Sequence, residues 1–300
     1  MERDIDGRYY AIKVALKAVF DQRLTGRERE SNSHNWHILC HVNGEEPTLY
    51  QVNAGKFIYD MSPQELADLL DIVQTILDDH LLEGGEQNLW AMDYVAAEYE
   101  RGTFGAYTNL SQQSQVYASQ TTLQQLLNSP GYLNQIAAAR LTTFSDWKVI
   151  SETARGDLTN IITDAVARGV NPRETASVIS KRLDVSMSKA KNIAQTEQVG
   201  ALREAQWNET DWASERLGLN TGLLHLSALK PTTRTTHAFW HGKVRTVQEV
   251  RDWYAVDGNK YHCYCSQIPV LLNDDGSIFN QGLAEKLAKE RQQWTTKEAA

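Results

Sequence analysis

The spacing of apolar side chains predicts helices along most of the chain and strands in two regions. Residues 8–20 place apolar side chains on one face of a helix. Between residues 35 and 59 apolar and polar positions alternate, with a turn at Asn43-Gly44 and a second extended stretch over 49–59. A short β-hairpin is therefore expected near the N-terminus. The apolar residues of its first strand are Trp36, Ile38, Cys40 and Val42.

Two helix starts are marked by a capping residue, a proline and an acidic residue. The first is Ser62 with Pro63 and Glu65, which form a capping box, and the second is Asn171-Pro172-Arg173-Glu174. Because glycine favours the left-handed backbone that ends helices, we expect the first helix to stop at Gly84-Gly85. Further helices are expected over 87–100, ended by Gly102, and almost continuously over 132–218, with Ser186 or Ser188 starting the last one and Gly218 ending it.

The pattern changes after residue 220, where short strands reappear. Residues 223–229 and 259–272 predict strands, and a short helix at 246–255 separates them. The expected fold class is α+β, with a mainly helical body, a small α+β C-terminal module and a short β-hairpin near the N-terminus. The expected domains are an acidic N-terminal domain (1–130), a helical segment (131–218), a small α+β His/Cys module (219–275) and a charged C-terminal helix or tail (276–300).

Charge is distributed unevenly along a chain of ordinary composition. The 300 residues are 41% hydrophobic and 23% charged, which is typical of soluble proteins, and the net charge is −8. Residues 1–150 carry 11 basic and 20 acidic side chains, whereas residues 151–300 carry 19 and 18. Any contact with a polyanion is thus expected in the second half, although two ordinary solvated surfaces would show the same split.

Sequence features that would indicate membrane insertion or secretion are missing. No apolar run reaches the roughly 18 residues that a membrane helix needs, and the N-terminus lacks the order of a secretion signal. Three cysteines cannot form a disulfide framework, so a reducing compartment or a metal is expected. The chain also lacks the phosphate-loop, dinucleotide-binding, His-Glu-x-x-His and Gly-x-Ser-x-Gly motifs, which lowers the expectation of an enzyme.

Two clusters of histidine and cysteine are candidate metal sites. In the first cluster, a strand would direct Cys40 to one face and His37 and His41 to the other, so an ordinary half-buried strand is expected instead of a metal site. Its members are His34, His37, Cys40 and His41.

The second cluster is a candidate zinc site, structural in preference to catalytic if a metal is bound. If residues 261–267 form a strand, Cys263 and Cys265 project from one face, and His237 from a neighbouring segment can join them, with His241 or a water as fourth ligand. His262 and Tyr264 would point to the opposite face. The alternative is two buried thiols beside a hydrogen-bonded histidine.

Arg234 and several aromatic residues lie close to this second cluster in the sequence. Arg234 could hold a carboxylate or phosphate, but a salt bridge to Glu197 or another helix acid is the favoured interpretation. The aromatic residues are expected to form mainly the core of a small domain. They are Trp240, Trp253, Tyr254, Tyr261 and Tyr264.

The order of these motifs resembles that of the phage Mu protein F-like head morphogenesis proteins. Ala194-Gln195-Thr196-Glu197 followed by Ala201 and Ala205 is similar to a family helix with Thr-Glu and then small residues. A Thr-Arg-x-x-His element at 233–237, a glycine at Gly242 and Cys-x-Cys at 263–265 follow in the family's order. The sequence departs from that pattern at Lys230-Pro231-Thr232, where an acid is usual, and at Tyr264, where arginine is common.

The resemblance, which covers about residues 150–272, implies a minor capsid protein of a tailed phage or prophage. It implies binding to the portal protein during head assembly in the host cytoplasm, a place in the virion near the portal vertex, and contact with scaffold or major capsid protein and with double-stranded DNA. Thr196, Glu197, Arg234 and Gly242 are the expected structural or binding residues. The alternative is a metal- or histidine-assisted hydrolase of nucleic acid or cell wall that uses His237, Arg234 and Glu197.

Overall fold

The computed structural model describes residues 1–28, 37–40, 48–51 and 57–298. These residues form a mainly helical α+β fold with small sheets near both ends of the chain, which confirms the predicted fold class. Contacts divide the chain into two compact units, each assembled from segments that are distant in sequence. Unit 1 comprises Met1, 84–145 and 191–300, and unit 2 comprises 2–83 and 146–190. The four predicted domains were contiguous, and their boundaries stay predictions.

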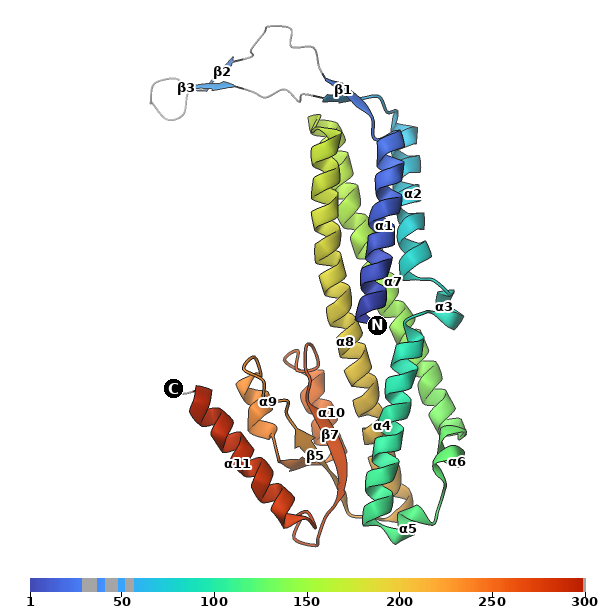
Figure 1. Cartoon of the computed structure of the whole chain (residues 1–300), viewed down its shortest axis with the longest axis vertical. Helices are drawn as coiled ribbons and strands as arrows, with labels where there is room; N and C mark the ends of the chain where they lie inside the picture. Colours follow the sequence, from blue (N-terminus) through green and yellow to red (C-terminus); the bar gives the residue numbers. More distant parts are fainter. Residues whose placement is uncertain (29–36, 41–47, 52–56, 299–300) are drawn as a thin grey trace. The chain divides into compact units, whose positions relative to one another are not determined.

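Unit 2 is a helical unit, in which α1 (Glu2–Arg23) lies beside α2 (Pro63–Leu81) (Figure 1). The helix predicted over 8–20 is confirmed and is longer than expected. Both helices bury one residue at every third or fourth position, the spacing that places side chains on a single helical face. The buried residues of α1 are Ile5, Tyr9, Ile12, Leu16 and Phe20, and those of α2 are Leu69, Val73, Leu77 and Leu81.

The start of α2 has the capping box that the sequence predicts. The Ser62 hydroxyl accepts a hydrogen bond from the Glu65 amide at 3.2 Å, and the Glu65 carboxylate accepts one from the Ser62 amide at 2.8 Å. The same bonds hold the pKa of Glu65 below its ordinary value. Two otherwise unpaired amides of the first turn are thereby satisfied.

The N-terminal strands form two antiparallel pairs. The predicted hairpin is present as β2 (His37–Cys40) and β3 (Thr48–Gln51), with Ile38 opposite Tyr50. The stretch predicted over 49–59 contains two strands, because β4 (Phe57–Tyr59) pairs with β1 (Gly26–Glu28) in a separate sheet. The first His/Cys cluster stays a prediction, because His34, His41 and the side chains of His37 and Cys40 lie outside the described residues.

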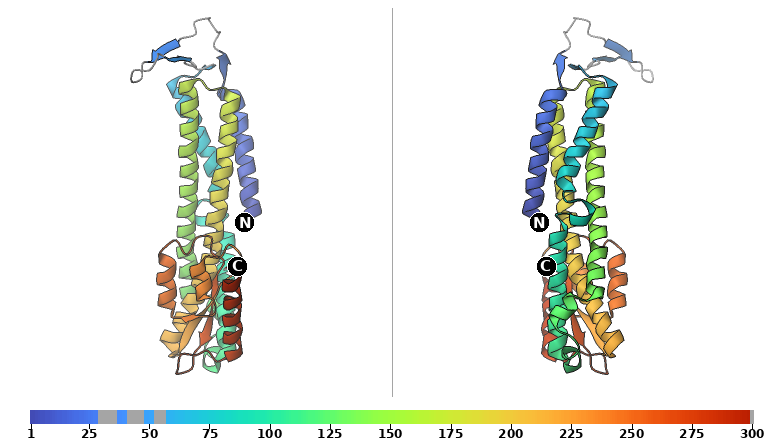
Figure 2. Two further views of the ribbon diagram at one scale, coloured as in Figure 1. Left: turned by 90° about the vertical axis from the view of Figure 1, so that its left-hand side faces the viewer. Right: turned by 90° about the vertical axis from the view of Figure 1, so that its right-hand side faces the viewer.

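The helical core of unit 1 is the contact between α4 (Met92–Gln113) and α8 (Pro172–Leu217), which run in the same direction (Figure 2). Ala201 and Ala205 of α8 pack against Val95 and Tyr99 of α4. The prediction that Gly102 ends a helix is wrong, because α4 continues through it. Four further helices complete the helical part of the described chain: α3 (Gly85–Asn88), α5 (Gln115–Ala118), α6 (Leu123–Leu127) and α7 (Pro130–Arg168).

Helix α8 begins where the sequence predicts but is not interrupted by the two serines. The Asn171 side chain accepts a hydrogen bond from the Arg173 amide at 2.9 Å, and Gly218 has the left-handed φ of 66° that marks the end. Ser188 donates to the Asp184 carbonyl at 3.0 Å, and the Ser186 hydroxyl pairs with Tyr9 at 2.8 Å. Their hydroxyl groups thus have partners that do not compete with the helix, so the predicted break is wrong.

The C-terminal part of unit 1 is an antiparallel sheet in the order β6-β5-β7, with helices around it (Figure 1). The strand predicted over 259–272 begins only at Ser266, and residues 259–265 form a loop of turns and irregular backbone. The predicted short helix and final helix are confirmed as α10 and α11. The elements are β5 (Thr221–Leu226), α9 (Thr235–Trp240), β6 (Val244–Arg245), α10 (Val247–Ala255), β7 (Ser266–Leu271) and α11 (Gln281–Glu298).

The close approach of α4 and α8 depends on Gly102. A Cβ atom at this position would lie 2.3 Å from the Leu202 carbonyl oxygen, so the backbones would have to separate. We expect Gly102→Ala to lower the free energy of unfolding by roughly 1–3 kcal/mol, measured by thermal and urea denaturation. Gly105→Ala is the matched control, because its Cβ would meet only the Gln206 side chain at 3.5 Å. A helix interior favours alanine, and equal loss of stability in both variants would contradict the explanation.

Candidate functional site

Helix α9 and the loop 259–265 bring His237, Cys263 and Cys265 together in unit 1. The His237 Nδ1 atom lies 3.2 Å from the Cys263 sulfur and 3.5 Å from the Cys265 sulfur. All three side chains are buried, and their ligand atoms lie within 4.8 Å of one another. The convergence expected from the sequence is therefore present in the structure. The side chains of His262 and Tyr264 are exposed, so the expected alternation of faces holds although the segment is a loop.

The orientation of the His237 ring is fixed by Asn259. The Asn259 amide nitrogen donates to the Trp253 carbonyl at 2.9 Å, which leaves its oxygen to accept from His237 Nε2 at 3.3 Å. With the proton on Nε2, the lone pair of Nδ1 points at the two sulfur atoms. The ring also packs edge-on against Trp253, with the ring centroids 4.5 Å apart. The histidine is thus held in one tautomer and one orientation.

The two thiols have different environments. Cys263 sulfur accepts a hydrogen bond from the Cys265 amide at 3.4 Å, and Cys265 sulfur lies 3.6 Å from the Ser227 hydroxyl. The hydrogen bond with the Cys265 thiol, together with His237 and Arg203, holds the pKa of the Cys263 thiol below its ordinary range. The same hydrogen bond and burial raise the pKa of the Cys265 thiol. The two thiols therefore differ in acidity, with Cys263 the more acidic of the pair.

Helix α8 holds the loop through a buried arginine. The Arg203 side chain is 1% exposed and donates to the main-chain carbonyls of Cys265 at 2.8 Å and Cys263 at 2.9 Å. Its guanidinium also lies over the Tyr254 ring, 4.3 Å from the centroid. About two turns before Arg203 on the same helix, Gln195 donates to the Cys263 carbonyl at 3.2 Å. Neither Arg203 nor Gln195 was predicted from the sequence. The one indication of a buried arginine was the position of Arg203 between the small residues Ala201 and Ala205.

A buried polar network lies between α8 and the sheet. The Gln267 side chain accepts from the Trp207 indole at 3.0 Å and donates to the Tyr254 hydroxyl and to His225 Nδ1. Burial lowers the pKa of His225 to about 3, so the ring is neutral. The Tyr254 hydroxyl in turn lies 3.7 Å from the Cys263 sulfur. This network reaches the Cys263 sulfur through the Tyr254 hydroxyl, and the sequence did not reveal it.

Arg234 is directed to main-chain oxygen atoms and not to an acid. Its guanidinium donates to the carbonyls of Gly258 at 3.0 Å, Asn259 at 3.1 Å and Tyr261 at 2.7 Å. The favoured interpretation, a salt bridge to Glu197 or another helix acid, is therefore wrong. Arg234 fixes the first half of the same loop whose second half Arg203 holds.

The family description "Phage Mu protein F like protein" matches residues 157–268. This region is phage Mu protein F-like. The match confirms the resemblance over this part of the chain. Neither a curated protein nor a solved structure is significantly similar to the chain. Within the described residues, no helix combines the length and hydropathy that a membrane span requires.

The residues that carry the resemblance all lie within the Mu F-like region, but they have different surroundings. Gly242 has a left-handed φ of 73°, and a Cβ there would lie 2.6 Å from Leu287 Cβ, so glycine is required for α11 to pack. Thr196 donates to the Asn192 carbonyl of its own helix at 2.9 Å. Glu197 is half-buried on α8. Neither Thr196 nor Glu197 lines the small hollow of about 50 Å³ that lies beside the His/Cys cluster.

His241, the expected alternative fourth ligand, lies outside the His/Cys cluster of the Mu F-like region. Its Nδ1 accepts from the Ser227 amide at 3.0 Å, and its Nε2 pairs with Glu290 of α11 at 3.1 Å. Both ring nitrogens therefore have partners, and the histidine links the sheet region to α11. Arg291 of α11 adds a bond to the His241 carbonyl.

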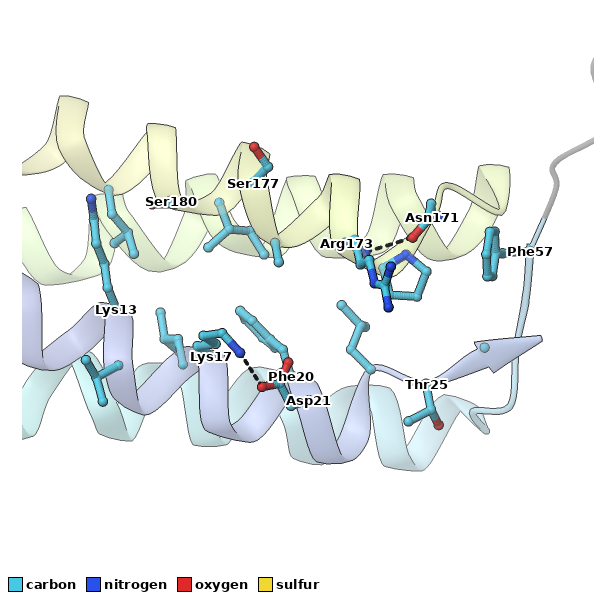
Figure 3. Close-up of a pocket in the computed structure, with 18 of the residues that line it drawn as sticks. Lys13, Lys17, Phe20, Asp21, Thr25, Phe57, Asn171, Arg173, Ser177 and Ser180 are labelled. Carbon is cyan, nitrogen blue, oxygen red and sulfur yellow. Dashed lines mark hydrogen bonds and ion pairs between the residues drawn. The ribbon is translucent and has the colours of Figure 1, made fainter. Parts of the chain in front are cut away.

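A second hollow of about 1120 Å³ lies in unit 2 between α1 and the first turns of α8, which belong to the Mu F-like region (Figure 3). Its walls are largely apolar, with Phe20, Leu24 and Ile179 among them. Lys17 at its rim pairs with Asp21 of the same helix. None of the described residues that line it is histidine or cysteine.

The hold of Arg203 on the loop can be tested by substitution. We expect Arg203→Met to lower the free energy of unfolding by roughly 3 kcal/mol, because two buried carbonyls lose a charged donor. Thermal denaturation followed by circular dichroism measures the change. Arg216→Met, at an exposed position near the end of the same helix, is the control and should melt close to wild type. An unchanged melting temperature for Arg203→Met would contradict the structural role.

Proposed function

We propose that the protein is a minor capsid component that binds the portal protein during phage head assembly. The observation that carries the proposal is the Mu F-like match, which covers the whole of α8 and the module as far as the first residues of β7. The packing of that module supports it, because most polar groups around the His/Cys cluster are bonded to each other. Scaffold and major capsid proteins are the further partners that this role implies, and a position inside the capsid near the portal vertex follows from it.

The geometry gives less support to the alternative hydrolase. That mechanism required His237, Arg234 and Glu197 to face one open cleft. Arg234 instead uses its guanidinium on three loop carbonyls, and His237 is enclosed by Asn259, Trp253 and the two sulfurs. The hollow beside the cluster measures about 50 Å³, which is room for a water or two and not for a polymer.

Contact with packaged DNA is favoured by the lysines of the C-terminal module. Lys230, Lys243 and Lys260 lie over the exposed rings of Tyr264, Phe239 and Tyr261, respectively. Within the described part of the chain, none of these ammonium groups forms an ion pair. Their charge is therefore available to phosphate groups, in agreement with the charge split along the sequence.

Portal binding is tested by co-expression of the full chain with the portal protein of the same phage genome. We expect the two to co-elute in size-exclusion chromatography, because head morphogenesis partners assemble before packaging. A portal protein from an unrelated phage is the control and should elute separately. Separate elution of the cognate pair, at concentrations well above micromolar, would remove the proposal.

DNA contact is tested by the salt dependence of duplex binding. Replacing Lys230 and Lys260 by glutamine removes two phosphate contacts, so the slope of log K against log salt should fall in magnitude by about 2. The matched control is Lys17→Gln with Lys148→Gln, which changes the charge equally at exposed helical positions paired with Asp21 and Glu152. Equal slopes for both double variants, or no salt-sensitive binding by wild type, would exclude this contact.

A further inference from the structure

The His/Cys cluster has the spacing of three corners of a tetrahedral metal site. Zinc binds cysteine sulfur at about 2.3 Å and histidine nitrogen at about 2.0–2.1 Å, so these atoms lie about 3.6 Å apart around a tetrahedral ion. The observed nitrogen–sulfur distances are 3.2 and 3.5 Å. We propose that His237, Cys263 and Cys265 bind one zinc ion.

The hydrogen bonds around the cluster are those that a metal ligand requires. A metal-bound imidazole commonly donates its other ring N–H to an oxygen atom, and Asn259 accepts that bond here. The Asn259 amide cannot exchange its roles without losing the bond to the Trp253 carbonyl. The amide of Cys265 donates to the Cys263 sulfur, a contact that favours a thiolate. The lone pair of Nδ1 and both sulfurs therefore face one point before any ion is bound.

The fourth position of the site opens to the small hollow. Its described walls contain no aspartate or glutamate. His262 also lines the hollow, but it is not part of the group whose ligand atoms all lie within 4.8 Å of one another. His241 has other partners for both ring nitrogens. The hollow of about 50 Å³ accommodates a water molecule. We therefore assign the fourth ligand to water.

The proposed ion stabilises the module and does not catalyse a reaction. Its ligands join α9 to the loop 259–265, two segments that share no strand pairing in the described residues. The hollow has no room for a substrate beside the bound water. Because metal affinity then contributes to folding, zinc should raise the melting temperature of the full chain. This inference stands independently of portal binding.

The test is the metal content of the full chain, purified under reducing conditions, stripped with a chelator and reconstituted with zinc. Wild type should retain about one zinc ion per chain after dialysis, measured by elemental analysis. The variants Cys263→Ser, Cys265→Ser and His237→Gln should each lose most of it. Cys40→Ser is the matched control, since this third cysteine lies outside the module, and it should keep its zinc.

Two further measurements remain informative even where a variant fails to fold. Cobalt bound to wild type should show thiolate-to-metal charge transfer and the intense visible bands of four-coordinate cobalt. Zinc should also protect two cysteines of wild type from alkylation, and mass spectrometry should place them at 263 and 265. A reconstituted wild type without zinc, a cobalt complex without thiolate bands, or zinc lost on Cys40→Ser but kept on Cys263→Ser would each overturn the assignment.

Discussion

The buried guanidinium of Arg203 is the interaction on which the C-terminal module depends. A charge that is 1% exposed must have its donors satisfied, and here they are used on the carbonyls of Cys263 and Cys265. Hydrogen bonds from a charged donor contribute roughly 1.5–3 kcal/mol each, more than neutral ones. They join the helix that carries the Thr-Glu motif to the loop that carries Cys-x-Cys. Motifs that are separate along the sequence are thereby brought into a single packed region.

Local patterns predicted those elements whose signals are contained in a few neighbouring residues. The capping box at Ser62 and the start at Asn171-Pro172 were correct because caps satisfy amides within one turn. Gly102 and Ser186 were misinterpreted because their roles are set by distant residues. Gly102 is required by the Leu202 carbonyl of another helix, and the Ser186 hydroxyl pairs with Tyr9. Such contacts leave no periodic signal in one sequence.

The sequence predicted the three side chains of the candidate site, but it did not predict the residues that hold them in place. Alternation correctly separated buried Cys263 and Cys265 from exposed His262 and Tyr264, although the segment is a loop in which His262 has a left-handed φ of 52°. Asn259 and Gln267 were missed, since a polar residue within an apparent strand gives no indication that it is buried. Asn259 bonds to His237 and Gln267 bonds to the Trp207 indole, and these partners are distant in the sequence and meet only in the folded chain.

Hydrogen bonds from side chains, and not pairing with a neighbouring strand, set the conformation of the loop 259–265. Arg234 binds the carbonyls of Asn259 and Tyr261 from one side, and Arg203 binds those of Cys263 and Cys265 from the other. A loop held in this way keeps little conformational freedom to lose when a partner binds. Its outward residues, Tyr261 and Tyr264 with their lysines, are therefore preorganised for contact. Preorganisation of an exposed surface reduces the conformational entropy lost on docking, and this is the property that the proposed partner binding would use.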